Sequence, residues 1–350
     1  MMNSLRNVAL FFGAAALVAG ALTGCSPAGS DSGIKIAFLL PESKTARYES
    51  NDRPYFENRI HELGEYEVLY SNADQDAAKQ QSQAEAALAS GVKVLVLDPV
   101  DSEAAVSIVT AANAQDVPVI AYDRIIGGGD LAYYVSFDNE NIGELQAQAF
   151  VDEVKANGGT EVLMLNGAPT DPNAVLFKRG AHEIIDESGL TVLNEFDTPD
   201  WSPDQAQNWV AGQITQYGDN IAGIYAGNDG TAGGAIAALK AANVSPLPTV
   251  SGQDAELSGI QRIVSGDQYL TIYKAMKAQA ELAAEVAVQL ANGEEVEADT
   301  EVDGTPTTLL GAQVVTIDNI MDTVVADGVF TVEQICTPDY ADACAAAGIE

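Results

Sequence analysis

Short apolar runs alternate along the chain with longer segments in which apolar residues recur at helical spacing. In the first third of the chain, the apolar runs lie at 34–40, 66–70, 92–98 and 117–122. Helical segments lie between them, at about 49–63, 74–90 and 101–115. Runs that are apolar on both faces are typical of parallel strands covered by helices on either side. The pattern therefore predicts a first α/β unit.

The same alternation recurs in the middle of the chain. Strands are predicted at 161–166, 191–196, 221–227 and 248–252, and helices at 139–157, 171–188, 203–216 and 229–242. Two late apolar runs, 268–274 and 312–317, come too late to begin a third domain. We therefore predict that the chain crosses back between two lobes, near 134–139, 253–257 and 303–312. The predicted fold is α/β: two doubly wound lobes with parallel-sheet cores, joined by a three-strand hinge.

These crossings divide the chain into five predicted parts. They are a signal peptide (1–24), a lipidated tether (25–33), an N-terminal lobe (34–137 plus 257–305), a C-terminal lobe (138–256 plus 306–330) and a tail (331–350). Each lobe is therefore expected to combine segments that are far apart in the sequence.

The N-terminus has the layout of an export signal. Arg6 precedes an uncharged apolar run at 8–21, which is too short to span a membrane. The motif LTGC at 22–25 resembles a bacterial lipobox, in which cleavage leaves the lipidated Cys25 as the first residue. The small and polar residues that follow are typical of a tether. We predict an exported protein that is lipid-anchored to the outer face of the cytoplasmic membrane or lies in the periplasm; the alternative is an ordinary signal peptide with a chance cysteine.

Two further cysteines, Cys336 and Cys344, lie in a short C-terminal segment, CTPDYADAC. Disulfides persist in exported proteins because their compartment is oxidising. We therefore predict a local disulfide in the tail, and two free thiols are the alternative.

The formal net charge of −35 argues against nucleic acid as a partner, because phosphate binding requires a basic face. Signals for catalysis are weak as well. His61 and His182 lie in polar helical segments away from any cysteine, so we expect neither a zinc site nor a catalytic triad. The nucleophile-elbow and P-loop motifs are missing from the sequence. We predict no catalytic residue, no metal and no cofactor.

Hydrogen-bonding side chains follow the predicted strands of both lobes. Asp123 and Arg124 come directly after the strand at 117–122. Later strands are followed by, or end in, Asp171, Asn173, Asn228, Asp254 and Lys274. In an open α/β sheet, ligands bind beyond the carboxyl ends of the strands. An N-cap would explain Asp171, and a local ion pair would explain Asp123 with Arg124. The recurrence of such residues in both lobes nevertheless favours a ligand site.

These residue types suit a neutral, polyhydroxylated ligand. A sugar hydroxyl both donates and accepts hydrogen bonds, whereas carboxylates accept, Arg and Lys donate, and Asn does both. The apolar C–H face of a sugar packs against aromatic rings. Tyr48 and Trp201 are candidates for that contact, and a plain surface or rim aromatic is the alternative for either.

Several long segments carry a resemblance to a known family: VIAYDR (119–124), SFDNENIGELQAQA (136–149), GNDGTAGGAIAAL (227–239), SGQDAELSGIQRI (251–263) and TIYKAM (271–276). Over about residues 34–330, the chain resembles the bacterial periplasmic sugar-binding proteins of the ribose/galactose type, most closely those that bind D-xylose for an ABC transporter. The resemblance implies a periplasmic binding protein type I fold, a role as a solute receptor, and a monosaccharide ligand between the lobes.

The resemblance also implies sugar-binding roles, position by position. They fall on Arg47, Tyr48, Asp123, Arg124, Asp171, Asn173, Trp201, Asn228, Asp254 and Lys274. Two departures bear on specificity. Tyr48 stands where the family has Trp, and Pro172 separates the two polar residues at the start of the second lobe.

The predicted function is that of a lipid-anchored solute receptor, a monomer that closes on D-xylose and then docks onto an ABC permease. The same role for glucose or another aldose is the nearest alternative. A sugar-responsive transcription regulator shares the two-lobed core, but it needs a DNA-binding headpiece where this chain has LTGC and a tether. An exported glycosidase that uses paired carboxylates is the third alternative.

Overall fold

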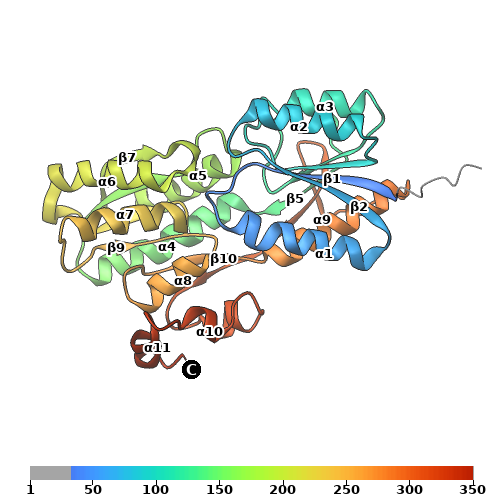
Figure 1. Cartoon of the computed structure of the whole chain (residues 1–350). Coiled ribbons are helices and arrows are strands. Elements are labelled where there is room, and N and C mark those ends of the chain that lie inside the picture. The colour runs from blue at the N-terminus through green and yellow to red at the C-terminus, as the bar shows by residue number, and fades with distance from the viewer. Residues whose placement is uncertain (1–32, 350) are drawn as a thin grey trace, which may run out of the picture. The chain divides into compact units, whose positions relative to one another are not determined.

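The computed structural model describes residues 33–349, which form two α/β lobes (Figure 1). The first lobe is built on a sheet in the order β11-β12-β5-β4-β3-β1-β2. Its strands are β1 (Ile34–Leu40), β2 (Tyr66–Asn72), β3 (Val94–Leu97), β4 (Val119–Tyr122), β5 (Tyr133–Phe137), β11 (Thr300–Val302) and β12 (Thr305–Leu310). Neighbouring strands pair in parallel, except β11 with β12. The parallel core predicted for this lobe is confirmed.

Helices cover both faces of this sheet, and this is why its strands are apolar along their whole length. On one face, α1 (Arg53–Leu63) and α9 (Met276–Ala291) pack against alternate residues of β1, β3, β4 and β5. On the other face, α2 (Ala77–Ala89) and α3 (Val106–Asn113) pack against the intervening residues. Figure 1 shows the two helix pairs on opposite sides of β1.

The second lobe repeats this architecture on a smaller sheet in the order β7-β6-β8-β9, with every pair parallel. Its strands are β6 (Glu161–Asn166), β7 (Thr191–Asp197), β8 (Gly223–Ala226) and β9 (Thr249–Val250). Its helices are α4 (Asn139–Ala156) and α5 (Pro172–Glu187) on one face, and α6 (Pro203–Tyr217) and α7 (Asp229–Ala241) on the other. Short 3-10 turns, η2 (Pro199–Trp201) and η3 (Gly218–Asn220), flank α6.

The chain passes between the lobes three times: between β5 and α4, between β10 and α9, and between β12 and β13. The strands β10 (Thr271–Lys274) and β13 (Ala312–Val315) pair antiparallel in a ladder separate from both sheets. Two of the three crossing segments are therefore held together by backbone hydrogen bonds.

Two lobe boundaries differ from those predicted. Helix α8 (Leu257–Val264) packs against α7 and so belongs to the second lobe, whereas the prediction places 257–305 in the first. Strand β12 completes the first-lobe sheet beside β5, whereas the prediction places 306–330 in the second lobe. An apolar pattern shows that a segment is a strand or a helix, but it does not show which of two similar sheets that segment joins.

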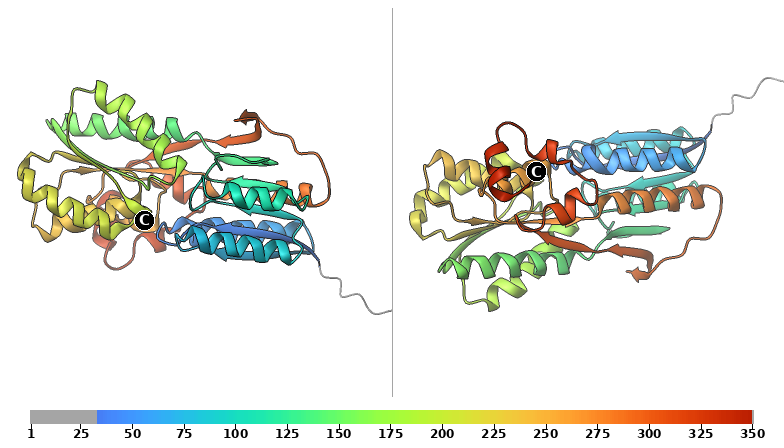
Figure 2. Two further views of the ribbon diagram at one scale, coloured as in Figure 1. Left: turned by 90° about the horizontal axis from the view of Figure 1, so that it is seen from above. Right: turned by 90° about the horizontal axis from the view of Figure 1, so that it is seen from below.

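The C-terminal tail folds against α8 (Figure 2). In the structure this tail begins earlier than the predicted residue 331: it comprises the π-helical turn η4 (Met321–Val325) and the short helices α10 (Val332–Ile335) and α11 (Ala341–Ala347). Cys336 and Cys344 form a disulfide in the structure, with their Cα atoms 5.9 Å apart. The buried side of the tail joins α8, β10 and β13 in one apolar cluster.

The predicted signal peptide (1–24), nearly all of the tether and the lipidation site Cys25 lie outside the described residues. Within residues 33–349, no helix is long and apolar enough to cross a membrane.

Candidate ligand-binding site

A cavity between the lobes collects every residue to which the sequence analysis assigns a sugar-binding role. With the lobes as described, the cavity is nearly filled by its own side chains and has a free volume of only about 20 Å³. Its lining comprises Thr45, Arg47, Tyr48, Asp123, Arg124, Asp171, Asn173, Phe177, Trp201, Asn228, Gln253, Asp254 and Lys274. They come from the segments after β1, β4, β6, β7, β8 and β9, and from the end of β10. The carboxyl ends of strands from both sheets therefore meet at one cavity.

Asp123 and Arg124 both reach the cavity because the chain leaves strand geometry directly after β4. Asp123 has a φ of 59°, in the left-handed region, and its backbone N–H donates to the carbonyl of Val135 at 2.9 Å. Successive side chains of a regular strand point to opposite faces. Two adjacent residues could not serve one ligand without this break.

The carboxylate of Asp123 accepts three hydrogen bonds within the first lobe. Oδ1 accepts from Arg47 Nη1 at 3.3 Å and from Gln279 Nε2 at 3.2 Å, and Oδ2 accepts from the Tyr48 hydroxyl at 3.1 Å. Arg47 also makes a two-pronged contact with Asp52, at 2.9 Å from Nε and 2.6 Å from Nη2. Such bidentate pairs fix the orientation of a guanidinium. This side of the cavity is therefore ordered by its own network.

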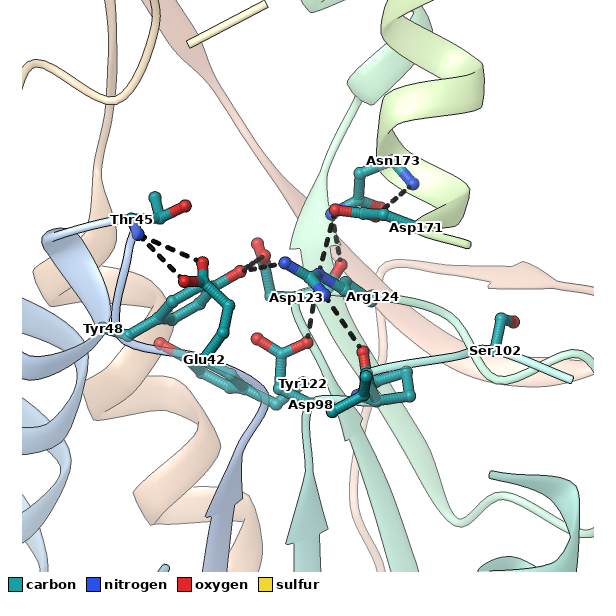
Figure 3. A network of polar contacts seen from close by, with 12 residues as sticks. Glu42, Thr45, Tyr48, Asp98, Ser102, Tyr122, Asp123, Arg124, Asp171 and Asn173 are labelled. Atoms are coloured by element: carbon teal, nitrogen blue, oxygen red, sulfur yellow. Dashed lines mark hydrogen bonds and ion pairs between the residues drawn. The ribbon is translucent and has the colours of Figure 1, made fainter. Parts of the chain in front are cut away.

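Arg124 lies between the lobes and pairs with a carboxylate of each (Figure 3). Its Nε is 3.0 Å from Oδ2 of Asp171 in the second lobe and 3.6 Å from Oδ1 of Asp98 in the first. Its terminal nitrogens donate to the Tyr48 hydroxyl and to the carbonyl of Pro99, each at 3.2 Å. The side chain is fully buried. Arg124 is thus the side chain that connects the two halves of the site.

On the second lobe, Asp171 is the N-cap of α5 and also holds the indole. Its Oδ1 accepts from the backbone N–H of Asn173 at 2.8 Å, and its Oδ2 accepts from Trp201 Nε1 at 2.9 Å. The N-cap explanation of Asp171 is therefore correct and is compatible with a place in the cavity. The indole packs against Gly167, where a Cβ would come within 2.0 Å of the ring. Asn173 Nδ2 donates across the lobes to the carbonyl of Asp123 at 3.1 Å.

The remaining predicted residues lie where β8 and β9 end and in β10. Lys274 Nζ is 2.7 Å from Oδ1 of Asp254 and 5.3 Å from the centre of the Phe177 ring. Asn228 is the N-cap of α7 and accepts from the backbone N–H of Thr231 at 2.8 Å. All three predicted side chains are at most 5% exposed, so each depends on partners inside the cavity.

Comparison with known proteins identifies the family. The profile of the family described as "Periplasmic binding protein domain" matches residues 36–295. The D-xylose-binding periplasmic protein of Haemophilus influenzae is 36% identical over 324 residues, which are 90% of this chain and 96% of that protein. This chain belongs to the periplasmic binding protein family. The D-xylose-binding periplasmic protein of Escherichia coli is 37% identical over 303 residues, 84% of this chain and 90% of that protein.

Solved structures agree with this assignment. An ABC transporter solute-binding protein from Clostridium phytofermentans, with bound β-D-glucose, superposes with a TM-score of 0.79 at 25% identity. It covers 86% of this chain and 99% of its own. A carbohydrate transporter solute-binding protein from Chloroflexus aurantiacus, in complex with D-glucose, has a TM-score of 0.78 at 27% identity and covers 86% of this chain and 98% of its own.

Burial and neighbouring charges act in opposite directions on the carboxyls of the site. Burial alone would raise the pKa of Asp123, but Arg47 and two further cations lower it to about 2. Burial raises the pKa of Asp98 well above its ordinary value, although Arg124 acts against this. Burial raises the pKa of Asp171 as well. Asp123 is therefore an ionised acceptor at neutral pH, whereas the pKa values of the other two carboxyls are shifted in the opposite direction.

Sequence reasoning missed three lining residues: Thr45, Phe177 and Gln253. Thr45 and Gln253 each lie within two residues of a predicted ligand, and Phe177 follows Asn173 by one helical turn. For Phe177, the spacing of one helical turn from Asn173 was the available signal, because residues one turn apart lie on the same face of a helix. Oε1 of Gln253 is buried and has no hydrogen-bond partner within residues 33–349, so it is available to a ligand.

Two further buried carboxyls support the cavity without lining it. Glu42 accepts from the backbone N–H of Thr45 at 3.0 and 3.2 Å and so shapes the loop after β1. Asp98 lies behind Arg124, and neither of its oxygens has a hydrogen-bond partner within residues 33–349. The sequence alone does not predict the supporting role of either residue, because that role depends on contacts made only in the folded protein.

Proposed function

We propose that this protein is the solute receptor of an ABC sugar importer and that its ligand is a monosaccharide, D-xylose in the first place. The observation that carries the proposal is that the ten predicted sugar ligands, from both lobes, line one buried cavity. The choice of sugar is supported by the 36% and 37% identity to two proteins named as D-xylose-binding.

The cavity offers sugar hydroxyls both charged donors and charged acceptors. The donors are Arg47, Arg124 and Lys274, and the acceptors include Asp123 and Asp254. Hydrogen bonds to charged groups are shorter and stronger than neutral ones. A ligand with a hydroxyl on nearly every carbon uses both kinds of partner, whereas an anion or a cation would be opposed by one of them.

Entry of a sugar requires the lobes to separate. Asp123, Arg124 and Asp171 are at most 3% exposed, so a sugar cannot reach them while the lobes lie as described. The Arg124–Asp171 pair and the hydrogen bond from Asn173 to Asp123 span the two lobes. We infer that sugar hydroxyls take over these partners and that hinge closure then buries the ligand.

Calorimetry with D-xylose, D-glucose, D-ribose and L-arabinose tests the proposal. We expect D-xylose to bind. Glucose differs by an exocyclic CH2OH group, and such a group alters binding by about 1–3 kcal/mol. Failure of all four sugars to bind would refute the proposal. Glucose as the ligand is the second candidate, supported by the similarity to two glucose-bound structures, and tighter binding of glucose than of xylose would select it.

We further propose that the protein is exported and held at the membrane by a lipid on Cys25. The support is the LTGC motif and the apolar segment before it. Replacing Cys25 by Ser should move the protein from the membrane fraction to the soluble fraction. Intact mass of the wild-type protein should show a diacylglycerol-modified N-terminal cysteine, and an unmodified mature N-terminus would contradict the proposal.

The remaining partner is a membrane permease, to which the closed, sugar-loaded form would dock as a monomer. Light scattering on the protein lacking residues 1–24 measures the oligomeric state. A dimer in the presence of saturating sugar would contradict the monomer proposal and leave the sugar assignment unaffected.

A further inference from the structure

A hydrogen bond outside the cavity also joins the two lobes. The side chain of Glu256, at the start of α8, accepts from the backbone N–H of Ala46 at 2.9 Å, although 210 residues separate them. Ala46 directly precedes Arg47 and Tyr48 in the loop after β1. Glu256 is only 7% exposed and is not among the residues that line the cavity. Its contact therefore acts on the loop that carries two sugar ligands rather than on the sugar.

A second carboxylate, that of Asp229, fixes the turn that presents Glu256. Oδ2 of Asp229 accepts from the backbone N–H of Glu256 at 2.9 Å and from Thr271 Oγ1 at 3.0 Å, and Oδ1 accepts from Gln268 Nε2 at 2.7 Å. The carboxylate fits against Gly259, where a Cβ would lie 2.2 Å from Oδ2. The backbone of Glu256 is thus anchored to the second lobe by the Asp229 carboxylate.

We propose that Glu256 is a positioning residue for sugar binding, which ties the loop carrying Arg47 and Tyr48 to the second lobe when the lobes close. This inference rests on the proposed function, because it concerns the affinity for the sugar. The donor belongs to the first lobe and the acceptor to the second, so the bond forms only in the closed arrangement. Its free energy therefore adds to closure and to ligand binding together.

The charges around Glu256 give this bond a pH signature. Burial, followed by the nearby carboxyls of Asp229 and Asp254, raises the pKa of Glu256 to about 8. The hydrogen bond from the Ala46 N–H, and then the charge of Arg262 of α8, oppose this rise without cancelling it. Glu256 lies in a groove between the first lobe, α8 and the tail. Arg47 is the charged residue that the first lobe contributes to this groove, and the tail contributes uncharged residues. Asp229, Asp254 and Arg262 remain beside Glu256 when the lobes separate, whereas its burial against the first lobe does not.

Opening of the lobes returns Glu256 to water, and its pKa then falls toward the ordinary value of a glutamate. Closing the lobes on a sugar consequently takes up a proton at Glu256 from solvent at neutral pH. Because the closed form has the raised pKa, affinity is highest at lower pH and falls as the pH rises through 7 toward 9. Asp229 does not contribute to this dependence, because it is enclosed in the second lobe in both arrangements.

The test compares Glu256→Ala and Glu256→Gln with the wild type, with Lys44→Gln as the matched control. Lys44 makes another contact between the lobes, 3.8 Å from Asp200, but both side chains are largely exposed and such pairs contribute little. D-Xylose titrations are run at pH 6, 7 and 9, each in two buffers of different ionisation enthalpy, so that proton uptake is measured directly. Thermal unfolding of each variant checks that it is folded.

We expect Glu256→Ala to weaken D-xylose binding roughly tenfold at pH 7, because the variant loses one buried hydrogen bond between the lobes. Glu256→Gln keeps an acceptor for Ala46, so it should stay within about threefold of the wild type while losing proton uptake and the fall in affinity toward pH 9. Lys44→Gln should match the wild type in affinity and in proton uptake.

The outcomes separate this inference from the proposed function. A wild type that binds no aldose refutes the proposed function and the inference with it. A wild type that binds D-xylose, together with a folded Glu256→Ala protein of unchanged affinity, refutes the inference alone. If Glu256→Ala does not fold, Glu256→Gln decides, because wild-type proton uptake in that variant excludes Glu256 as the group that titrates on closure.

Discussion

Replacing Arg124 by Ala tests the proposed site at the side chain that connects its two halves. The guanidinium is 3.0 Å from Asp171 of the second lobe and 3.6 Å from Asp98 of the first, and it donates to the Tyr48 hydroxyl. It is only 1% exposed. Its removal leaves two buried carboxyls without their nearest cation and deprives the sugar of a charged donor.

The magnitude follows from the burial of these partners. Truncating one member of a buried, hydrogen-bonded charge pair costs about 2–5 kcal/mol of binding. Burial already raises the pKa of Asp98 and of Asp171, so each carboxyl can take up a proton instead of remaining an unpaired charge. We therefore expect the lower part of the range, about 2–3 kcal/mol, which weakens binding roughly 30- to 160-fold.

Calorimetry with D-xylose measures this loss in the wild type, in Arg124→Ala and in Arg124→Lys. Lysine retains the charge but not the planar fork that contacts several partners at once, so its affinity should lie between the other two. The affinity of Arg124→Ala should improve toward acid pH, because protonation of Asp98 and Asp171 relieves their repulsion. Urea unfolding without sugar reports the separate effect on stability.

Unchanged affinity in a folded Arg124→Ala protein would refute this reasoning. So would a large decrease in the free energy of unfolding with no loss of affinity, because Arg124 would then be a structural ion-pair partner and not a sugar ligand. Arg124→Lys binding as weakly as Arg124→Ala would show that the geometry of the fork, rather than the charge, determines recognition.

Three further predictions follow from the described residues. With saturating D-xylose present to keep the lobes closed, burial raises the pKa values of Asp229 and Glu256 to about 7 and about 8, so unfolding releases their protons. The free energy of unfolding should therefore fall from pH 5 to pH 9, by about 1.4 kcal/mol per unit of pKa difference and group. Urea titrations at several pH values measure this, and a rise would contradict it. Gly167→Ala should displace the indole of Trp201, because the new Cβ would come within 2.0 Å of the ring. We expect the free energy of unfolding to fall by about 1–3 kcal/mol and the sugar-induced change in tryptophan fluorescence to weaken. A fluorescence response like that of the wild type would argue against the contact. Cys336→Ser removes a disulfide between cysteines 8 residues apart. The free energy of unfolding should fall by about 2–3 kcal/mol, and the affinity for D-xylose should stay unchanged. A loss of affinity would show that the tail contributes to the site.

The sequence predicted helices and strands correctly where consecutive apolar residues indicate that a segment is buried. The strands predicted at 34–40 and 161–166 coincide with β1 and β6, because a strand covered on both faces must be apolar at consecutive positions. The sequence indicated less clearly which strands pair with each other in a sheet. Segment 305–310 was not recognised as a strand of the first lobe, because its Thr-rich sequence lacks a long apolar run and its partner β5 lies far away along the chain.

The polar candidates that follow strands, such as Asp123 and Arg124, could be predicted because parallel strands place their carboxyl ends at one edge. Arg47 was assigned only by the resemblance to the family. The partners of these residues could not be predicted in this way. The roles of Asp98, Gln253 and Glu256 depend on contacts with Arg124, the cavity and Ala46, and no local pattern records a contact between segments so far apart. Local periodicity thus determined the elements and the strand ends. The tertiary structure decided the lobe that each late segment joins, the partners of each buried carboxyl and the bonds that hold the lobes together, because these depend on contacts between distant segments.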